Sequence, residues 1–197
     1  DGRYEQAYEV LEQHRGEYPL SLLLDLPTAR FALIAGKPQQ ALRILEQRLP
    51  DLTSGIEPIS ARNVMPALDL VTAQLQTGAK SQARALLERV AFFLDGPDVP
   101  RLPLFAFQSA RAHALAGDPD AAMRALDRAY AEGLRTTWAL DLRPQSLLYI
   151  DPIEADPAFA SMMRADPRLE RWYARLKAGN ARERERLLGQ LTTRATN

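Results

Sequence analysis

Apolar residues recur along most of the chain three to four positions apart, which is the spacing of one face of an amphipathic helix. The clearest example is the stretch GDPDAAMRALDRA, residues 117–129, where Ala122, Leu126 and Ala129 fall on one side of a helix. Its glycine ends the preceding helix and its Asp-Pro step starts the next one. Few segments alternate with the period of two that strands show. The pattern therefore predicts an all-α protein.

The same arrangement, a glycine with an alanine five positions later and a leucine nine positions later, occurs four times. The four sets are Gly2–Ala7–Leu11, Gly36–Ala41–Leu45, Gly78–Ala83–Leu87 and Gly117–Ala122–Leu126. Their glycines are 34, 42 and 39 residues apart, and periods of about 20–50 residues are typical of stacked repeats. We therefore predict helical hairpins with very short turns, in which each glycine is a left-handed cap and each alanine lets two helices cross closely.

Small and apolar residues accompany three of these glycines in the order of a known repeat. They are Ala29, Ala32, Ala41 and Leu45 around Gly36; Val71, Ala83, Leu87 and Val90 around Gly78; and Ala110, Ala122, Leu126 and Ala129 around Gly117. This order resembles the tetratricopeptide repeat (TPR) over residues 1–133. The resemblance implies a TPR-like α–α superhelix with a half unit at 1–18 and units at about 20–50, 59–95 and 101–133.

Local departures from the repeat lead to further predictions. The two longer steps predict inserted loops near 51–60 and 95–102, and Pro27 predicts a kink or a delayed start in its helix. Pro38, Ser81 and the Asp118–Pro119 step are predicted to help start the second helices. The opening half unit lacks a first helix, so we expect the chain to be part of something longer.

Residues 134–197 contain three Asp-Pro steps, at 151, 156 and 166, which predict short capping helices in succession, followed by a tail helix from Asn180. We expect these residues to cover the last hairpin: Trp138, Leu147, Leu148, Tyr149, Phe159, Met162 and Met163. The order of aromatic residue, leucines and DPAF is similar to the tail of repeat regions in bacterial signalling proteins, where a winged-helix DNA-binding or nucleotide-cyclase domain lies upstream. That similarity implies a regulatory or sensing module.

Charge and composition narrow the class of partner. Lys plus Arg and Asp plus Glu both number 25, so the formal net charge is zero, which argues against nucleic acid as the main partner. The chain has no cysteine, which excludes disulfides and thiol chemistry and suits cytoplasm and periplasm alike, with the cytoplasm favoured. We see no membrane segment, since the longest apolar stretch is interrupted by Asp25, Pro27 and Arg30.

Candidate catalytic chemistry is sparse. His14 and His113 are the only histidines and have no carboxylate partner nearby in sequence, so packing is the favoured role for them. The stretch TGAKS at 77–81 lacks the upstream glycine of a phosphate-binding loop and is interpreted as a hairpin turn. We therefore expect no enzyme activity, no metal and no cofactor.

The TPR resemblance implies a concave groove lined by the first helix of each hairpin. The residues predicted to bind a partner there are Leu26, Arg30, Leu33, Leu68, Thr72, Gln76, Phe107 and Arg111. A protein or peptide partner could lie along the groove, with Arg30 and Arg111 orienting an acidic or carbonyl-bearing group. In the alternative, the chain's own last helix fills the groove and the protein is a structural module that spaces domains or forms a homodimer.

Overall fold

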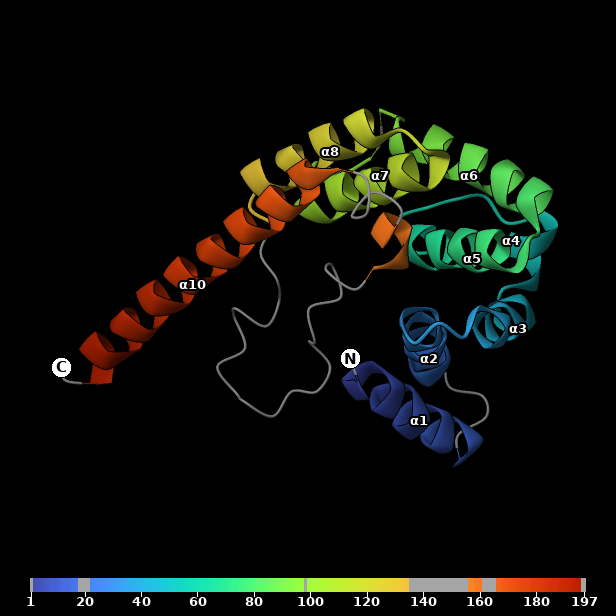
Figure 1. Cartoon of the computed structure of the whole chain (residues 1–197), viewed down its shortest axis with the longest axis horizontal. Helices are drawn as coiled ribbons and strands as arrows, with labels where there is room; N and C mark the ends of the chain where they lie inside the picture. The colour runs from blue at the N-terminus through green and yellow to red at the C-terminus, as the bar shows by residue number, and fades with distance from the viewer. Residues whose placement is uncertain (1, 18–21, 98, 135–155, 161–165, 196–197) are drawn as a thin grey trace.

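The structure is a computed structural model that describes residues 2–17, 22–97, 99–134, 156–160 and 166–195. All regular elements in these ranges are helical, which confirms the prediction of an all-α protein (Figure 1). They are α1 (Gly2–Glu17), α2 (Leu22–Ile34), α3 (Pro38–Arg48), α4 (Pro50–Ser54), α5 (Val64–Thr77), α6 (Lys80–Leu94), α7 (Pro103–Ala116), α8 (Pro119–Ala131), the 3₁₀ turn η3 (Pro157–Phe159) and α10 (Pro167–Ala195).

Three helix pairs, α2–α3, α5–α6 and α7–α8, are joined by turns that share one backbone geometry. Gly36, Gly78 and Gly117 have φ values of 72°, 89° and 80°, a left-handed conformation that glycine adopts without strain from a Cβ. In each turn the glycine N–H donates three residues back, and the next N–H donates five residues back. This is the Schellman cap, so the predicted role of these glycines is confirmed.

The alanines that follow these turns are fully buried. Ala41, Ala83 and Ala122 have no exposed surface, as expected if each lies where two helices approach too closely for a larger side chain. Leu45 and Leu126 are also buried, while Leu87 is half-buried. The prediction that these alanines are buried within the hairpins is therefore confirmed.

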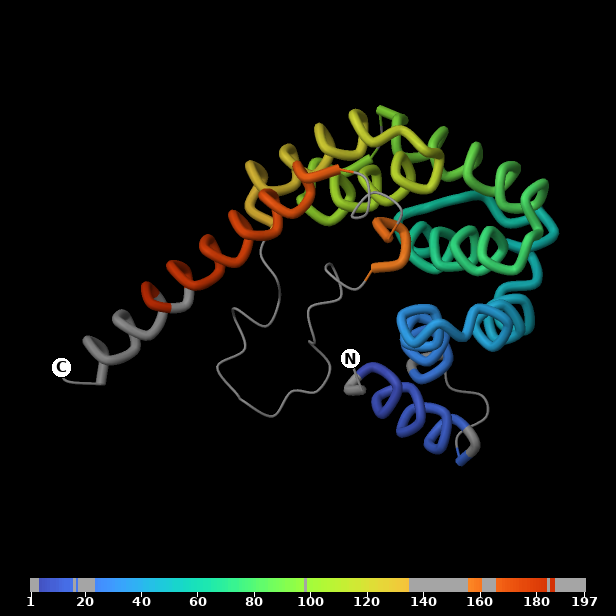
Figure 2. The backbone as a smooth tube through the Cα atoms, in the orientation of Figure 1, coloured from blue at the N-terminus to red at the C-terminus, as the bar shows by residue number. Residues whose placement is uncertain are grey.

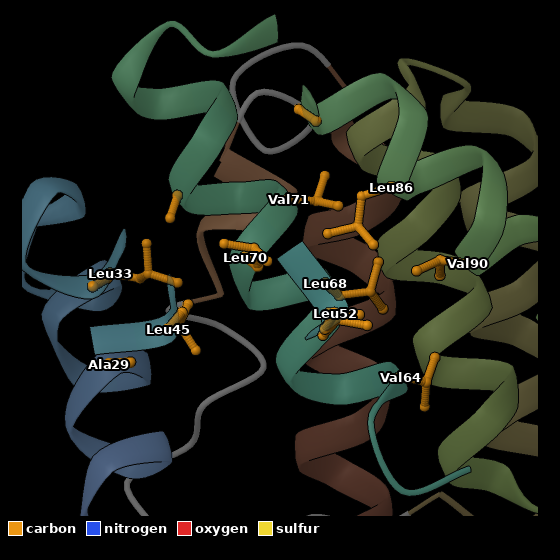
Figure 3. Close-up of a cluster of buried hydrophobic side chains, with 14 of the residues drawn as sticks. Ala29, Leu33, Leu45, Leu52, Val64, Leu68, Leu70, Val71, Leu86 and Val90 are labelled. Atoms are coloured by element: carbon orange, nitrogen blue, oxygen red, sulfur yellow. The ribbon is translucent and has the colours of Figure 1, made fainter. Parts of the chain in front are cut away.

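The helix pairs follow one another along an arc, and η3 lies on its inner side beside α5 and α7 (Figures 1 and 2). One hydrophobic core is shared by helices α1 to α7; Figure 3 shows part of it, where Leu33 and Leu45 from the second and third helices lie opposite Leu68 and Leu70 of α5. A second core joins α7 and α8 to η3 and the first half of α10. The chain after the last hairpin is therefore part of the packed molecule.

Several local predictions are corrected. Ser81 does not cap α6, because that helix already begins at Lys80 and the Ser81 hydroxyl contacts Gln82 instead. Pro27 lies inside α2, which is helical from Leu22. The insertion predicted near 51–60 contains the short helix α4, and the Arg89 guanidinium holds this insertion by donating to the carbonyls of Leu52 and Glu57.

The C-terminal segment also differs from the prediction. No helix begins at Asn180, because α10 runs without a break from Pro167 to Ala195. Asp156 and Asp166 do cap backbone N–H groups, of Ala158 and Arg168, as their Asp-Pro steps predicted. Among the predicted covering residues Phe159 is fully buried, and the other six, Trp138, Leu147, Leu148, Tyr149, Met162 and Met163, lie outside the described residues.

Candidate functional site

Four charged side chains from four separate elements meet on the inner side of the arc: Arg30 of α2, Asp69 of α5, Arg111 of α7 and Asp156, which precedes η3. Arg30 donates to Asp69 Oδ1 and to Asp156 Oδ2, each at 2.6 Å. Arg111 donates to Asp69 Oδ1 at 2.6 Å, and its Nε lies 2.8 Å from Asp156 Oδ2. Each guanidinium thus contacts both carboxylates, and we call these four residues the charge cluster.

The charge cluster is almost closed to solvent. Arg111 is 2% exposed and the Asp156 side chain is fully buried, while Arg30 and Asp69 keep 18% and 11% of their side-chain surface. Burial by itself opposes ionisation of Asp156, but the charges of Arg111 and Arg30 outweigh it and hold the pKa of that carboxyl below its ordinary value. Burial likewise opposes the charge on Arg30, yet Asp156 and Asp69 raise its pKa.

Further hydrogen bonds fix the cluster in place. Arg111 Nη1 donates to Gln108 Oε1 at 2.9 Å, one turn back along α7. The second carboxylate oxygen of Asp156 accepts from the Ala158 backbone N–H at 3.0 Å and so caps η3. One aspartate therefore both shapes the 3₁₀ turn and ties it to two helices of the array.

An aromatic contact holds the same turn three residues later. Phe159 is fully buried, and its ring lies 5.8 Å from that of Phe107, centroid to centroid, at an interplanar angle of 50°. This is within the range of favourable aromatic pairs. The segment 156–160 is thus held at two points. The carboxylate of Asp156 pairs with Arg30 and Arg111, and the ring of Phe159 packs in the second core.

The eight residues predicted to line the groove differ in exposure. Leu33, Leu68, Thr72, Phe107 and Arg111 are buried, Leu26 and Arg30 are half-buried, and Gln76 is exposed. The Thr72 hydroxyl donates to the carbonyl of Leu68 within its own helix. Arg30 and Arg111, which were predicted to orient an acidic or carbonyl-bearing group of a partner, pair in this structure with Asp69 and Asp156 of the chain itself.

The short turn η3 packs on α7, next to the arginines that were predicted to line the groove. In the part of α10 whose side chains are described, the helix packs on α7 and α8 through Leu169, Trp172, Tyr173 and Leu176. Asp69 was not predicted from the sequence. Its place in the apolar run ALDLV could have indicated a buried ion pair, because a buried carboxylate needs a cationic partner. The partner position of Asp156 has no comparable local signal.

The two carboxylates of the charge cluster are both engaged in ion pairs. The lowered pKa of Asp156 keeps it ionised near neutral pH, which does not suit a proton donor. Among the residues that the structure describes, no group of three or more histidines and acids is arranged to hold a metal ion. His14 is exposed and contacts the Val10 carbonyl, and His113 is half-buried at the end of α7.

Comparison of the chain with protein-family models, with curated proteins and with solved structures found no match. Within the described helices, none combines the length and the apolar character needed to cross a bilayer.

Proposed function

We propose that the chain is a non-catalytic interaction module of the TPR-like type, which recognises a segment carrying a carboxylate followed three residues later by an aromatic ring. The observation that carries the proposal is the docking of Asp156 on Arg30 and Arg111, together with the packing of Phe159 on Phe107. In this view residues 156–160 act as an internal ligand, and a partner segment of the same chemistry takes their place.

The arginines give this site a preference for a carboxylate. Arg30 and Arg111 come from different hairpins, and Asp69 supplies only one carboxylate between them. A second carboxylate completes the charge balance and accepts charge-assisted hydrogen bonds in a largely dry setting, where such bonds are strong. A neutral segment at the same place would leave the Arg111 guanidinium buried beside a single aspartate, which is unfavourable.

The aromatic contact adds selectivity for shape. Phe107 and Phe159 belong to a core that also includes Ala106 and Ala110 of α7, so the position next to Phe107 accommodates a ring. Burial of a phenyl side chain contributes roughly 1.5–3 kcal/mol. A carboxylate and a ring held at the two ends of a single turn therefore define the proposed recognition motif.

The experiment uses the full chain with Asp156→Asn and Phe159→Ala, which removes both anchors of the internal segment. A labelled peptide EADPAFAS, the sequence of residues 154–161, is titrated against this variant and followed by fluorescence anisotropy, with EANPAAAS as the matched control peptide. We expect the variant to bind EADPAFAS saturably and not to bind EANPAAAS. The affinity of EADPAFAS for the unsubstituted protein should be about tenfold weaker or more, because the tethered segment 156–160 competes for the site. Unchanged circular dichroism shows that the variant is folded.

Adding Arg30→Gln to the variant should abolish capture of the peptide. A folded variant that binds neither peptide would overturn the proposal and favour the alternative, a structural module whose inner surface is permanently filled by its own chain. If the double variant does not fold, Phe159→Ala alone keeps the charge cluster, and the same peptide competes for a site that has lost only its aromatic anchor.

A further inference from the structure

A second site, distinct from the charge cluster, lies where α10 runs alongside α8 (Figure 1). The two helices are joined by two ion pairs: Arg168 Nη2 lies 2.8 Å from Asp120 Oδ1, and Arg175 pairs with Asp127. Both pairs link residues 48 positions apart in the sequence. The helices are therefore parallel and in register, with one ion pair two turns beyond the other.

The level midway between these pairs has a different charge pattern. Arg124 of α8 and Arg171 of α10, 47 positions apart, both line the groove of about 440 Å³ between the helices. Both side chains are exposed, and neither makes an ion pair or a hydrogen bond with any part of the chain that the structure describes. Two guanidinium groups without a direct ion pair thus lie on the two helices, although the charge of Arg171 contributes to lowering the pKa of Asp166. On either side of this level, Arg168 and Arg175 each pair with an aspartate of α8.

The carboxylates of the groove are already engaged. Asp120 and Asp127 hold the outer arginines, and the neighbouring Asp166 also contacts Arg168. Four arginines and two aspartates line the groove, so its lining has a net positive charge. The net charge is still positive when the neighbouring Asp166 is counted. The like charges at the middle level repel one another unless an anion lies between them.

The floor of the groove adds an apolar surface and one unsatisfied donor. Met123 and Trp172 line it beneath the arginines, and both are buried. The indole nitrogen of Trp172 is itself closed to solvent and has no hydrogen-bond partner among the residues that the structure describes, which is uncommon for a buried polar group. An organic anion can therefore pack its carbon atoms on this floor while its oxygens face the arginines.

We infer that the groove between α8 and α10 binds an oxyanion, a phosphate monoester or a carboxylate, between Arg124 and Arg171. The planar guanidinium fork matches either group with paired hydrogen bonds. This site is independent of the inner charge cluster, since it shares no residue with it. The groove between α8 and α10 would therefore recognise negatively charged groups separately from the charge cluster.

The test uses the emission of Trp172 in the full chain. Trp138 is the other tryptophan in the sequence, so Trp138→Phe leaves Trp172 as the single reporter. Inorganic phosphate and succinate are titrated separately at constant ionic strength, and each titration is repeated by calorimetry so that a silent indole cannot hide binding. Saturation by phosphate alone identifies a phosphate site, and saturation by succinate alone identifies a carboxylate site; saturation by both supports the general oxyanion site.

We expect Arg124→Gln or Arg171→Gln to weaken binding about fivefold or more, because a charge-assisted pair is lost, and the double variant to show no saturation. Arg171→Lys, which keeps the charge without the fork, should fall between the natural chain and Arg171→Gln. Arg182→Gln is the matched control, since Arg182 is exposed on the same helix outside the groove. The inference is overturned if neither anion saturates the natural chain, or if the double variant binds as well as the Arg182→Gln control.

Discussion

Arg111 and Asp69 form an almost fully buried ion pair, with 2.6 Å between Arg111 Nη2 and Asp69 Oδ1, and they connect the first helices of two successive hairpins, α7 and α5. Asp69 also pairs with Arg30 of α2, and Arg111 also pairs with Asp156, the residue that precedes η3. The charge cluster thus connects four elements that are far apart in the sequence. Each of the two carboxylates contacts both guanidinium groups, so the four charges balance within the cluster.

Removing one member of this pair should be strongly destabilising. Asp69→Asn leaves Arg30 and Arg111 with one carboxylate, and breaking a buried pair from one side typically costs about 3–5 kcal/mol of unfolding free energy. Urea denaturation measures the loss. Glu5→Gln, which removes the exposed carboxylate of the Lys37–Glu5 surface pair, is the control and should cost about 1 kcal/mol or less. A loss in Asp69→Asn no greater than in the control would show that the cluster does not need this carboxylate.

Replacing both members of the pair should be much milder. The double variant Asp69→Leu with Arg111→Met removes one positive and one negative charge and leaves Arg30 with Asp156. Apolar replacement of a whole buried pair is often close to neutral, so we expect an unfolding free energy well above that of Asp69→Asn. If the double variant is as unstable as Asp69→Asn, the ion pair stabilises the fold by more than the neutralisation of two buried charges.

The acid dependence of stability should follow Asp156. Its pKa is lowered in the folded chain, whereas an unfolded aspartate titrates near pH ~3.9. The stabilisation is therefore complete above about pH 4 and is lost as the pH falls through the lower folded pKa. Urea midpoints measured from neutral to acidic pH should fall more steeply for the natural chain than for Asp156→Asn. Parallel curves for the two proteins would contradict this assignment.

The close crossing of α5 and α6 should not tolerate a larger side chain. Ala83 is fully buried, so Ala83→Leu should cost roughly 1–3 kcal/mol of unfolding free energy through overpacking. Ala85→Leu adds the same atoms at an exposed position of the same helix and should change stability by about 0.5 kcal/mol or less. Equal effects of the two substitutions, measured by thermal or urea unfolding, would show that the helix spacing is not set at the alanine.

Gly179 is predicted to be coupled to Tyr130. A Cβ at Gly179 would lie 2.9 Å from the Tyr130 hydroxyl oxygen, so Gly179→Ala forces the ring of α8 to shift. Alanine is intrinsically better than glycine inside a helix by about 1 kcal/mol, and this gain is offset by the clash. In a Tyr130→Phe background the clash is absent, and Gly179→Ala should be clearly more stabilising there than in the natural chain. A double-mutant cycle by urea denaturation tests this, and additive effects would contradict it.

The parts of the fold that were predictable depend on local chemistry. A left-handed turn needs glycine and a close crossing needs a small residue, so Gly36, Gly78 and Gly117 with their following alanines could be located from spacing alone. The course of α10 through Gly179 and Asn180 could not, because these residues are buried in the folded chain, Gly179 beside Tyr130 of another helix. Tertiary packing there overrides a local signal for a helix boundary.

The candidate site was predictable only in part, for a similar reason. The repeat resemblance implied that Arg30 and Arg111 share one surface, and the structure brings them together through Asp69 and Asp156. The long-range choice of partner is set by three-dimensional packing, since Asp156 lies 126 positions from Arg30. Sequence spacing could indicate the helix face but not the turn that covers it.

The docked turn also sets the electrical character of the inner surface. With Asp156 in place, two cations and two anions cancel; with residues 156–160 withdrawn, Arg30, Arg111 and Asp69 leave one net positive charge facing solvent. The departure of a few residues thus converts a neutral surface into one that attracts anions.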